Sequence, residues 1–459
     1  MSATTVVKVF PAKHFFVEML TRDISLADAI LDLLDNCVDG VRRKQNHHGT
    51  KPYNGFYAEI KFDENQFSIT DNCGGISKSD AEGYAFMFGR PHTAPARNDR
   101  TIGLVGIGMK RAMFKIGTSC VVHSHHAKDT FDVAITPKWL KDDSDWNLKL
   151  QPAKSDMKKH GTRIVVTDIR DTVRNDFAAG SNFRDDELPT RVREAFGLLI
   201  ERGFKVSING NVVKSEVPHL LWQQDGKGKV DVIRPYVYRD TIDGVDIFMA
   251  FGFREADRGN VDDRSSQRYQ SDLAGWTVAC NDRIVLSCDR SELTGWGSMG
   301  VPRFHTQFIY LSGIVEFHSS NTNALPFTTT KRGINEGSSV FLKVRDRMIE
   351  ALKQFTSWTN EWKDRPTSDR EQLFQKAKSL PLPEIRAAVA QEYKTLPSSK
   401  GQPIKPKLPK AKVSTEVNIQ FRRSQSDIDT VSEYLFDEIK SARSVGEACF
   451  DRVLEEAAE

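Results

Sequence analysis

The sequence of 459 residues has no apolar run near the roughly 20 residues that are needed to cross a bilayer. Its first residues, MSATTVVKVFPAKHFF, lack the apolar core and the small-residue cleavage site of a signal peptide. None of the six cysteines forms a CxxC pair, which argues against a structural zinc site and for free thiols in a reducing compartment. We therefore expect a cytoplasmic protein without a membrane segment.

The chain also has little net charge and no internal repeat. A formal charge of +3 neither requires nor excludes a nucleic-acid partner, because a basic patch can lie within a nearly neutral total. The length is enough for about three domains of roughly 150 residues each.

The first half alternates helical and strand-like segments. We expect a helix over 15–48, strands over 56–62 and 66–70, an irregular mobile stretch over 77–102, and a helix after the glycines at 103–108. Further strands are expected near 119–124, 130–136, 162–168 and 204–208. This alternation predicts an α/β sandwich.

Strand-like runs return between 230 and 318, and helix is expected over 337–360, over 367–395 and over 425–458. The intervening segment TLPSSKGQPIKPKLPKAK is rich in proline and lysine, which predicts an extended, solvated linker. We assign the fold to the α+β class and divide the chain into 1–215, a second α/β domain over 216–360, a helical segment 361–395, the linker 396–412 and a C-terminal helical segment 413–459.

The first long helix, SLADAILDLLDNCVDG, has one strongly acidic face. Ser25 is a suitable N-cap and Gly40 a suitable stop. At 100° per residue, one face carries only Asp28, Asp32, Asp35, Asn36 and Asp39. This face could simply be solvated. However, like charges four residues apart destabilise a helix, and divalent metal or phosphate chemistry would use such a face.

Two glycine-containing segments follow. In FSITDNCGGIS, Asp71 ends a strand before Gly74 and Gly75; it is either an ordinary strand exit or an acceptor for the exocyclic amine of a flat base. In IGLVGIGMKRAMFKIG, the glycines form GxxGxG before a helix, so backbone N–H groups can surround phosphate oxygens. The irregular stretch upstream does not fit a dinucleotide-binding fold, which needs a strand there.

These segments, in this order, resemble the GHKL ATPase superfamily of gyrase B subunits, heat-shock chaperones, histidine kinases and MutL proteins. Asp32 and Asn36 match the N-box, Asp71 and Gly75 the adenine-binding box, and the sequence HGTR at 160–163 a late Gly-Thr element. Within this family the chain looks similar to bacterial heat-shock-like and MORC-like ATPases. The resemblance implies an N-terminal Bergerat-type sandwich that binds ATP and Mg²⁺.

The resemblance also implies roles for individual residues. Asp32 would be the catalytic base, where the family usually has glutamate, and its shorter arm would affect hydrolysis more than binding. Asn36 would hold Mg²⁺. Cys73 replaces a usual glycine. The implied ATP-binding residues are Asn36, Asp71, Gly75, Ile76, Gly103, Leu104, Val105, Gly106, Ile107, Gly108, Met109, Lys110 and Thr162.

A fainter resemblance covers the second domain. GWTVACNDRIVL resembles the NxR strand of a transducer domain, and LPFTTTKRGIN the loop whose lysine reaches the ATP γ-phosphate. Lys331 would then be a catalytic lysine; otherwise it is an exposed lysine in a threonine-rich loop. The family implies a homodimer that closes a lid, over 77–102, on ATP, with a protein or DNA partner.

Two other functions stay open. A GHKL-type protein kinase is disfavoured, because only about 25 residues precede the N-box and they hold no phosphoacceptor-histidine helix. An ATPase subunit of a DNA-processing or phage-defence system would need a separate partner, since the sequence shows no evident nuclease motif.

Overall fold

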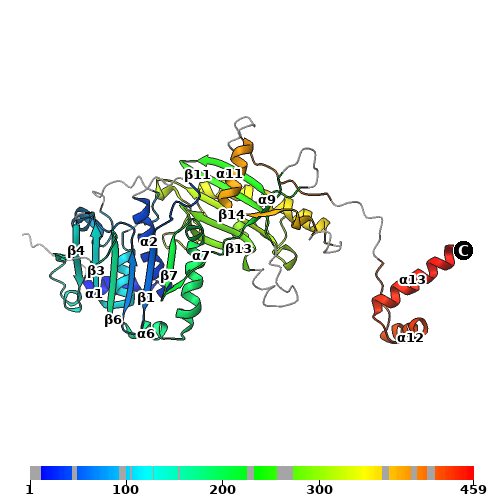
Figure 1. Cartoon of the computed structure of the whole chain (residues 1–459), viewed down its shortest axis with the longest axis horizontal. Helices are drawn as coiled ribbons and strands as arrows, with labels where there is room; N and C mark the ends of the chain where they lie inside the picture. Colours follow the sequence, from blue (N-terminus) through cyan, green and yellow to red (C-terminus); the bar gives the residue numbers. More distant parts are fainter. Residues whose placement is uncertain are drawn as a thin grey trace, which may run out of the picture. The chain divides into compact units, whose positions relative to one another are not determined.

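The computed structural model describes residues 12–43, 49–91, 100–103, 106–127, 129–153, 156–224, 232–255, 272–363, 372–393, 401–410 and 419–458. The chain forms two compact units, Met1–Pro409 and Lys410–Glu459. The first unit holds two large sheets and one small one (Figure 1). Among the described residues, no helix is both long and apolar enough to cross a membrane.

The N-terminal sheet has eight strands in the order β5-β4-β3-β6-β2-β1-β7-β8. Only the β1–β7 pair among them is parallel; the other neighbours are antiparallel. The strands are β1 Tyr57–Phe62, β2 Phe67–Asp71, β3 Gly117–His126, β4 Asp129–Ile135, β5 Leu150–Pro152, β6 Gly161–Ile169, β7 Lys205–Ile208 and β8 Asn211–Val212.

Helices share one apolar core with this sheet, which confirms the predicted sandwich. Four of them are α1 Lys13–Arg22, α2 Leu26–Arg42, α4 Gly108–Ile116 and α7 Leu188–Glu201. The shorter elements are α3 Lys78–Asp80, α5 Pro137–Lys141 and α6 Asp171–Phe177, with single π-helical turns at Ala81–Ala85 and Phe183–Glu187.

Helix α2 is shorter than the helix expected over 15–48. The break before it follows from Ser25, whose side chain accepts a hydrogen bond from the Asp28 N–H and so starts a new helix. The expected stop at Gly40 is wrong, because α2 runs on to Arg42. Gly40 instead permits close packing: a Cβ on it would lie 2.7 Å from the carbonyl oxygen of Cys73.

The second sheet has the order β10-β11-β14-β12-β13. Its strands are β10 Tyr236–Ile242, β11 Val245–Phe253, β12 Gly275–Cys280, β13 Arg283–Asp289 and β14 Leu311–His318. Both faces are covered. Phe248 and Ala250 of β11 share a core with helix α11 (Leu382–Tyr393), while Phe251 and Phe253 make edge-to-face contacts with Phe355 of helix α9 (Ser339–Glu361). Burial on both faces explains the continuous apolar run IFMAFGF at 247–253.

Smaller elements complete the described chain. Residues 367–395, expected to be helical, instead contain strand β15 (Lys378–Leu380), which pairs with β9 (Leu220–Trp222) before α11 begins. Single 3₁₀ turns lie at Glu292–Thr294, Thr306–Phe308 and Thr322–Ala324. In the second unit, helices α12 (Gln425–Phe436) and α13 (Ala442–Ala458) are separated at Asp437, whose φ is 55°.

The described part of the proline- and lysine-rich segment, 401–410, is extended but is not a free solvated linker. Ile404 exchanges two backbone hydrogen bonds with Val237 of β10, at 3.1 and 2.8 Å. Farther along, the Trp358 indole N–H donates to the Pro409 carbonyl at 2.7 Å. The unpaired edge of β10 supplies the partners that water would otherwise supply. Residues 396–400 and 411–412 lie outside the described ranges.

Candidate nucleotide site

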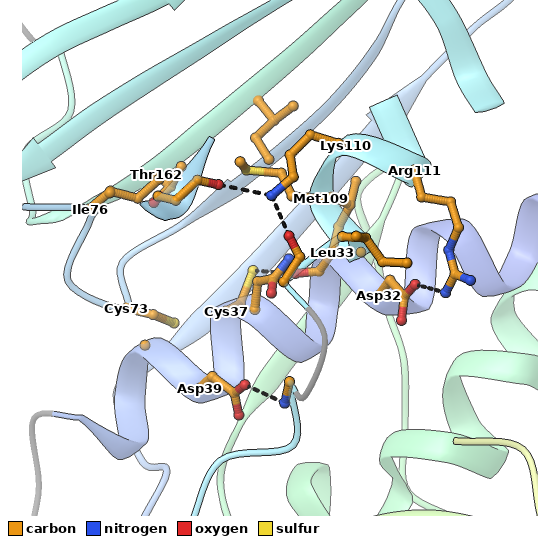
Figure 2. A pocket seen from close by; sticks show the side chains of 18 of the residues that line it. Asp32, Leu33, Cys37, Asp39, Cys73, Ile76, Met109, Lys110, Arg111 and Thr162 are labelled. Atoms are coloured by element: carbon orange, nitrogen blue, oxygen red, sulfur yellow. Dashed lines mark hydrogen bonds and ion pairs between the residues drawn. The ribbon is translucent and has the colours of Figure 1, made fainter. Parts of the chain in front are cut away.

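The sequence-predicted residues meet at one cavity of about 450 Å³ in the first unit. Segments far apart in the chain form its walls: α2, the end of β2, the glycine segment with α4, the start of β6 and the loop at 329–331 (Figure 2). Among the predicted residues, those that line it are Asp32, Asn36, Asp71, Gly75, Ile76, Gly103, Gly106, Ile107, Gly108, Met109, Lys110, Thr162 and Lys331. Leu104 and Val105 lie outside the described residues.

Helix α2 is buried at every position except Asn36, so the acidic face is not simply solvated. Asn36 lies on the cavity wall with its side chain exposed and therefore accessible to a ligand. The aspartates beside it are buried and need compensating charges. The helix itself carries no lysine, and the partners come from distant segments.

Asp32 lies between two cations. The Arg111 guanidinium, from α4, bonds one carboxylate oxygen, and the Lys331 ammonium lies 3.1 Å from the other. Figure 2 shows the Arg111 side chain extending from α4 to Asp32 on α2. Gly108 permits this contact, since a Cβ there would be 3.3 Å from the Asp32 side chain. The carboxylate of Asp32 is thus held in a defined orientation at the cavity wall.

Lys331 also contacts Asp35, at 2.8 Å, and Arg283 of β13 contacts the same carboxylate at 2.9 Å. Burial disfavours the charged form of Asp35, but Lys331 and Arg283 together hold its pKa below the usual value. Burial likewise disfavours the charged lysine, yet Asp35 and Asp32 raise the pKa of Lys331. Lys331 is therefore not a free surface lysine.

Asp71 ends β2 and is held by three donors. Its Oδ1 accepts from the backbone N–H of Cys73 at 2.7 Å and of Thr162 at 3.3 Å, and the Cys37 thiol lies 3.5 Å from Oδ2. Burial raises the pKa of Asp71, and these donors only partly oppose that effect. A buried acceptor in a fixed orientation suits recognition of a flat donor.

Backbone approaches near Asp71 leave no room for side chains. A Cβ on Gly161 would lie 1.9 Å from the Asp71 carbonyl oxygen. Gly75 has φ 72°, and a Cβ there would lie 2.5 Å from the His125 carbonyl. Gly75 and Gly161 therefore allow the backbones of β2, β3 and β6 to approach one another closely.

The glycine segment ends at the N-terminus of α4. Gly106 has φ 75°, and α4 begins at Gly108. The backbone N–H groups of its first turn therefore lie at the end of the helix that borders the cavity. Lys110 is buried and donates to the carbonyls of Ala85, at 3.0 Å, and Gly106. Burial lowers the pKa of Lys110 to about 8. A buried lysine held only by carbonyls among the described residues is suited to bind an anion.

Sequence reasoning missed several residues of this site. Arg111 lies three positions after Gly108, on the α4 turn that faces α2, and its place in the pattern MKR was the available signal. Cys37 follows the N-box asparagine and bonds Asp71, but a cysteine carries no local signal for that contact. Arg283 contacts Asp35 from a position 248 residues away, which no local pattern could reveal.

Comparison with known families agrees with this geometry. Residues 24–164 match the family described as histidine kinase-, DNA gyrase B- and HSP90-like ATPase. This part of the chain is therefore a domain of the GHKL ATPase superfamily. The matched range runs from the residue before the α2 cap to the start of β6, so it contains every wall of the cavity except the loop with Lys331. A comparison with curated proteins gave no match.

Proposed function

We propose that the chain is a Mg²⁺-dependent ATPase whose hydrolysis drives lid closure and association of two copies. The observation that carries this proposal is the convergence of the N-box helix, the base-side aspartate, the glycine segment and Lys331 on one cavity. Pockets of 300–1,000 Å³ usually hold small ligands, and about 450 Å³ lies within that range.

The chemistry of the walls fits Mg·ATP. At one end, the buried Asp71 offers an acceptor for the adenine amine. At the other, Lys110, Arg111 and the first turn of α4 offer cations and N–H groups for phosphates. Asn36 is the exposed oxygen ligand between them, suited to a hard cation. Asn36 would hold Mg²⁺, which would supply positive charge to offset the charge that develops on the phosphates.

The residues of the chain then take distinct roles. Asp32 would accept a proton from the attacking water, which requires that its pairing with Lys331 be exchanged for other partners. Lys110 and the N–H groups of α4 would orient the phosphates. Asp71 would select adenine over guanine, because its carboxylate can accept but not donate a hydrogen bond.

Lys331 would couple the position of the second sheet to whether ATP or ADP is bound. It comes from the loop between β14 and α9, yet it reaches the N-box carboxylates. A lysine that contacts a γ-phosphate makes a contact available with ATP and absent with ADP, and such differential affinity is what shifts a conformational equilibrium. We propose that residues 1–215 are the ATPase domain and 216–360 a transducer domain of a cytoplasmic, dimeric switch that acts on a protein or DNA partner, as in heat-shock-like and MORC-like ATPases.

The proposal is tested with Asp32→Asn. ATP affinity should stay within a few-fold of wild type, while turnover should fall by roughly 10²–10⁴, because the base is removed but its shape is kept. Asp28→Asn is a matched control: it is on the same helix, is similarly buried and pairs with Arg191, but does not line the cavity. Turnover of Asp32→Asn within twofold of wild type would remove Asp32 from this role.

A further inference from the structure

Residues 101–103, at the start of the glycine segment, form hydrogen bonds with the second sheet on one side and with α2 on the other. The Thr101 carbonyl accepts hydrogen bonds from Asn281 Nδ2 at 3.2 Å and from Thr322 Oγ1 at 3.0 Å. Both donors belong to the second sheet: Asn281 lies in the β12–β13 turn, and Thr322 follows β14. Thr101 is 1% exposed, so water does not compete for this carbonyl.

The next two residues are held by the first domain. The N–H groups of Ile102 and Gly103 donate to the two oxygens of Asp39 on α2, at 2.8 and 2.9 Å. Figure 2 shows the Asp39 carboxylate turned toward this segment of backbone. Residues 101–103 therefore lie between α2 and the second sheet, and Gly103 itself lines the cavity.

The donor on the second sheet is itself fixed. Asn281 has φ 46°, a conformation that asparagine tolerates, and its amide exchanges hydrogen bonds with the backbone of Ser319 at 3.0 Å in both directions. Arg42, at the end of α2, donates to the Asn281 carbonyl and lies 3.5 Å from Asp39. Arg42 thus contacts both Asp39 and Asn281, the residues that bond residues 101–103 from α2 and from the second sheet.

We infer that Asn281 and Thr322 are positioning residues for the nucleotide site: from the second sheet they set where Gly103, on the cavity wall, presents its backbone to phosphates. Neither residue lines the cavity, so their effect passes through Thr101. A shift of the second sheet relative to α2 would then alter nucleotide handling without any contact to nucleotide. This inference rests on the proposed ATPase function, and its first test does not depend on ATP.

The first test is hydrogen–deuterium exchange of the nucleotide-free full chain, followed in a peptide that contains Ile102 and Gly103. Thr322→Val removes one donor to the Thr101 carbonyl while keeping side-chain shape, and exchange there should become about fivefold faster. Thr277→Val is the matched control, since Thr277 is also buried, in β12, but its hydroxyl bonds Cys288 within the same sheet. Equal exchange in the two variants would overturn the inference.

The second test is steady-state ATP turnover by the same variants. Thr322→Val should lower kcat/KM about fivefold relative to Thr277→Val, Thr322→Ser should restore it because the donor returns, and Asn281→Gly combined with Thr322→Val should lower it further. Failure of serine to restore turnover would show a role in packing and overturn the positioning role. A wild-type chain that binds no ATP would refute the proposed function and this role together, while the exchange test still reports whether the second sheet holds residues 101–103.

Discussion

Two charge clusters link distant parts of the first unit and differ in composition. The cavity cluster consists of Asp32, Asp35, Lys331, Arg111 and Arg283, and it borders the space proposed for nucleotide. The junction cluster consists of Asp282, Glu316, Arg202, Arg386, His318 and Tyr53, and it joins α7 and the first sheet to the second sheet.

The difference lies in what each cluster could contact. In the junction cluster, Glu316 is 0% exposed, and its two oxygens are taken by Arg202 and Arg386. Asp282, Glu316 and His318 lie near enough to hold a metal, but the arginines already satisfy those carboxylates. In the cavity cluster, Asp32 and Lys331 line open space and can exchange partners. One cluster holds the two large sheets together, and the other borders the cavity.

The largest effect is expected from breaking the junction cluster. Arg202→Met should lower the free energy of unfolding by about 3–5 kcal/mol, because Asp282 and Glu316 lose a buried cation. Denaturant titration measures this loss. Arg193→Met on the same helix breaks a half-exposed pair with Glu216 and should cost at most about 1 kcal/mol. Equal losses in the two variants would show that burial does not set how much these ion pairs contribute to stability.

Breaking the cavity cluster should affect catalysis more than folding. Lys331→Ala should lower ATP turnover by roughly 10²–10³, the usual effect of removing one donor to transition-state charge, with ADP affinity nearly unchanged. Asp35 keeps Arg283 as a partner in this variant. Calorimetry with ADP and steady-state turnover measure the two quantities, with Arg332→Ala as the neighbouring control. If ADP binding falls as much as ATP binding, Lys331 does not sense the γ-phosphate.

Lowering the pH should remove the stability that the junction cluster contributes, over a defined pH range. Burial disfavours the charged form of Asp282, but Arg202 and His318 hold its pKa at about 2, below the ordinary 3.8. Because the folded-state pKa is depressed, this stabilisation is complete above about pH 4 and is lost as pH falls toward 2, on the order of 2 kcal/mol. Unfolding titrations of wild type and Asp282→Asn compare the slopes. Asp246→Asn, which changes an exposed carboxylate, should leave the wild-type slope unchanged.

The smallest effect is expected at the base-side end of the cavity. Asp71→Asn should cost about 1–3 kcal/mol of ATP binding, some 5- to 150-fold, because an amide replaces the charged acceptor. The N–H groups of Cys73 and Thr162 should keep the amide oxygen on their side and leave its NH₂ facing a base amine. Competition between ATP and GTP measures the preference, and a wild-type chain that binds both equally would contradict the adenine role.

Local patterns revealed much of the first domain. The acidic face of α2, Asp71 before its glycines and the GxxGxG segment each carry a short-range signal, and all three lie on the cavity. Gly40 shows the limit of such signals: a glycine near a helix end predicts a stop, whereas here close packing against Cys73 requires it. The pairing of residues 401–410 with the edge strand β10 could not be predicted either, because composition does not tell which strand of a sheet lacks a neighbour.

The sequence by itself determined the class of the N-terminal domain and the segments that carry its chemistry, because helical periodicity, turn residues and glycine spacing are properties of neighbours in the chain. Only the tertiary structure decided how the charges pair. Lys331 meets Asp32 and Asp35, and Asn281 meets Thr101, across about 180 to 299 residues. Such contacts depend on the packing of two sheets around α2, and each buried charge takes whichever partner that packing brings within reach.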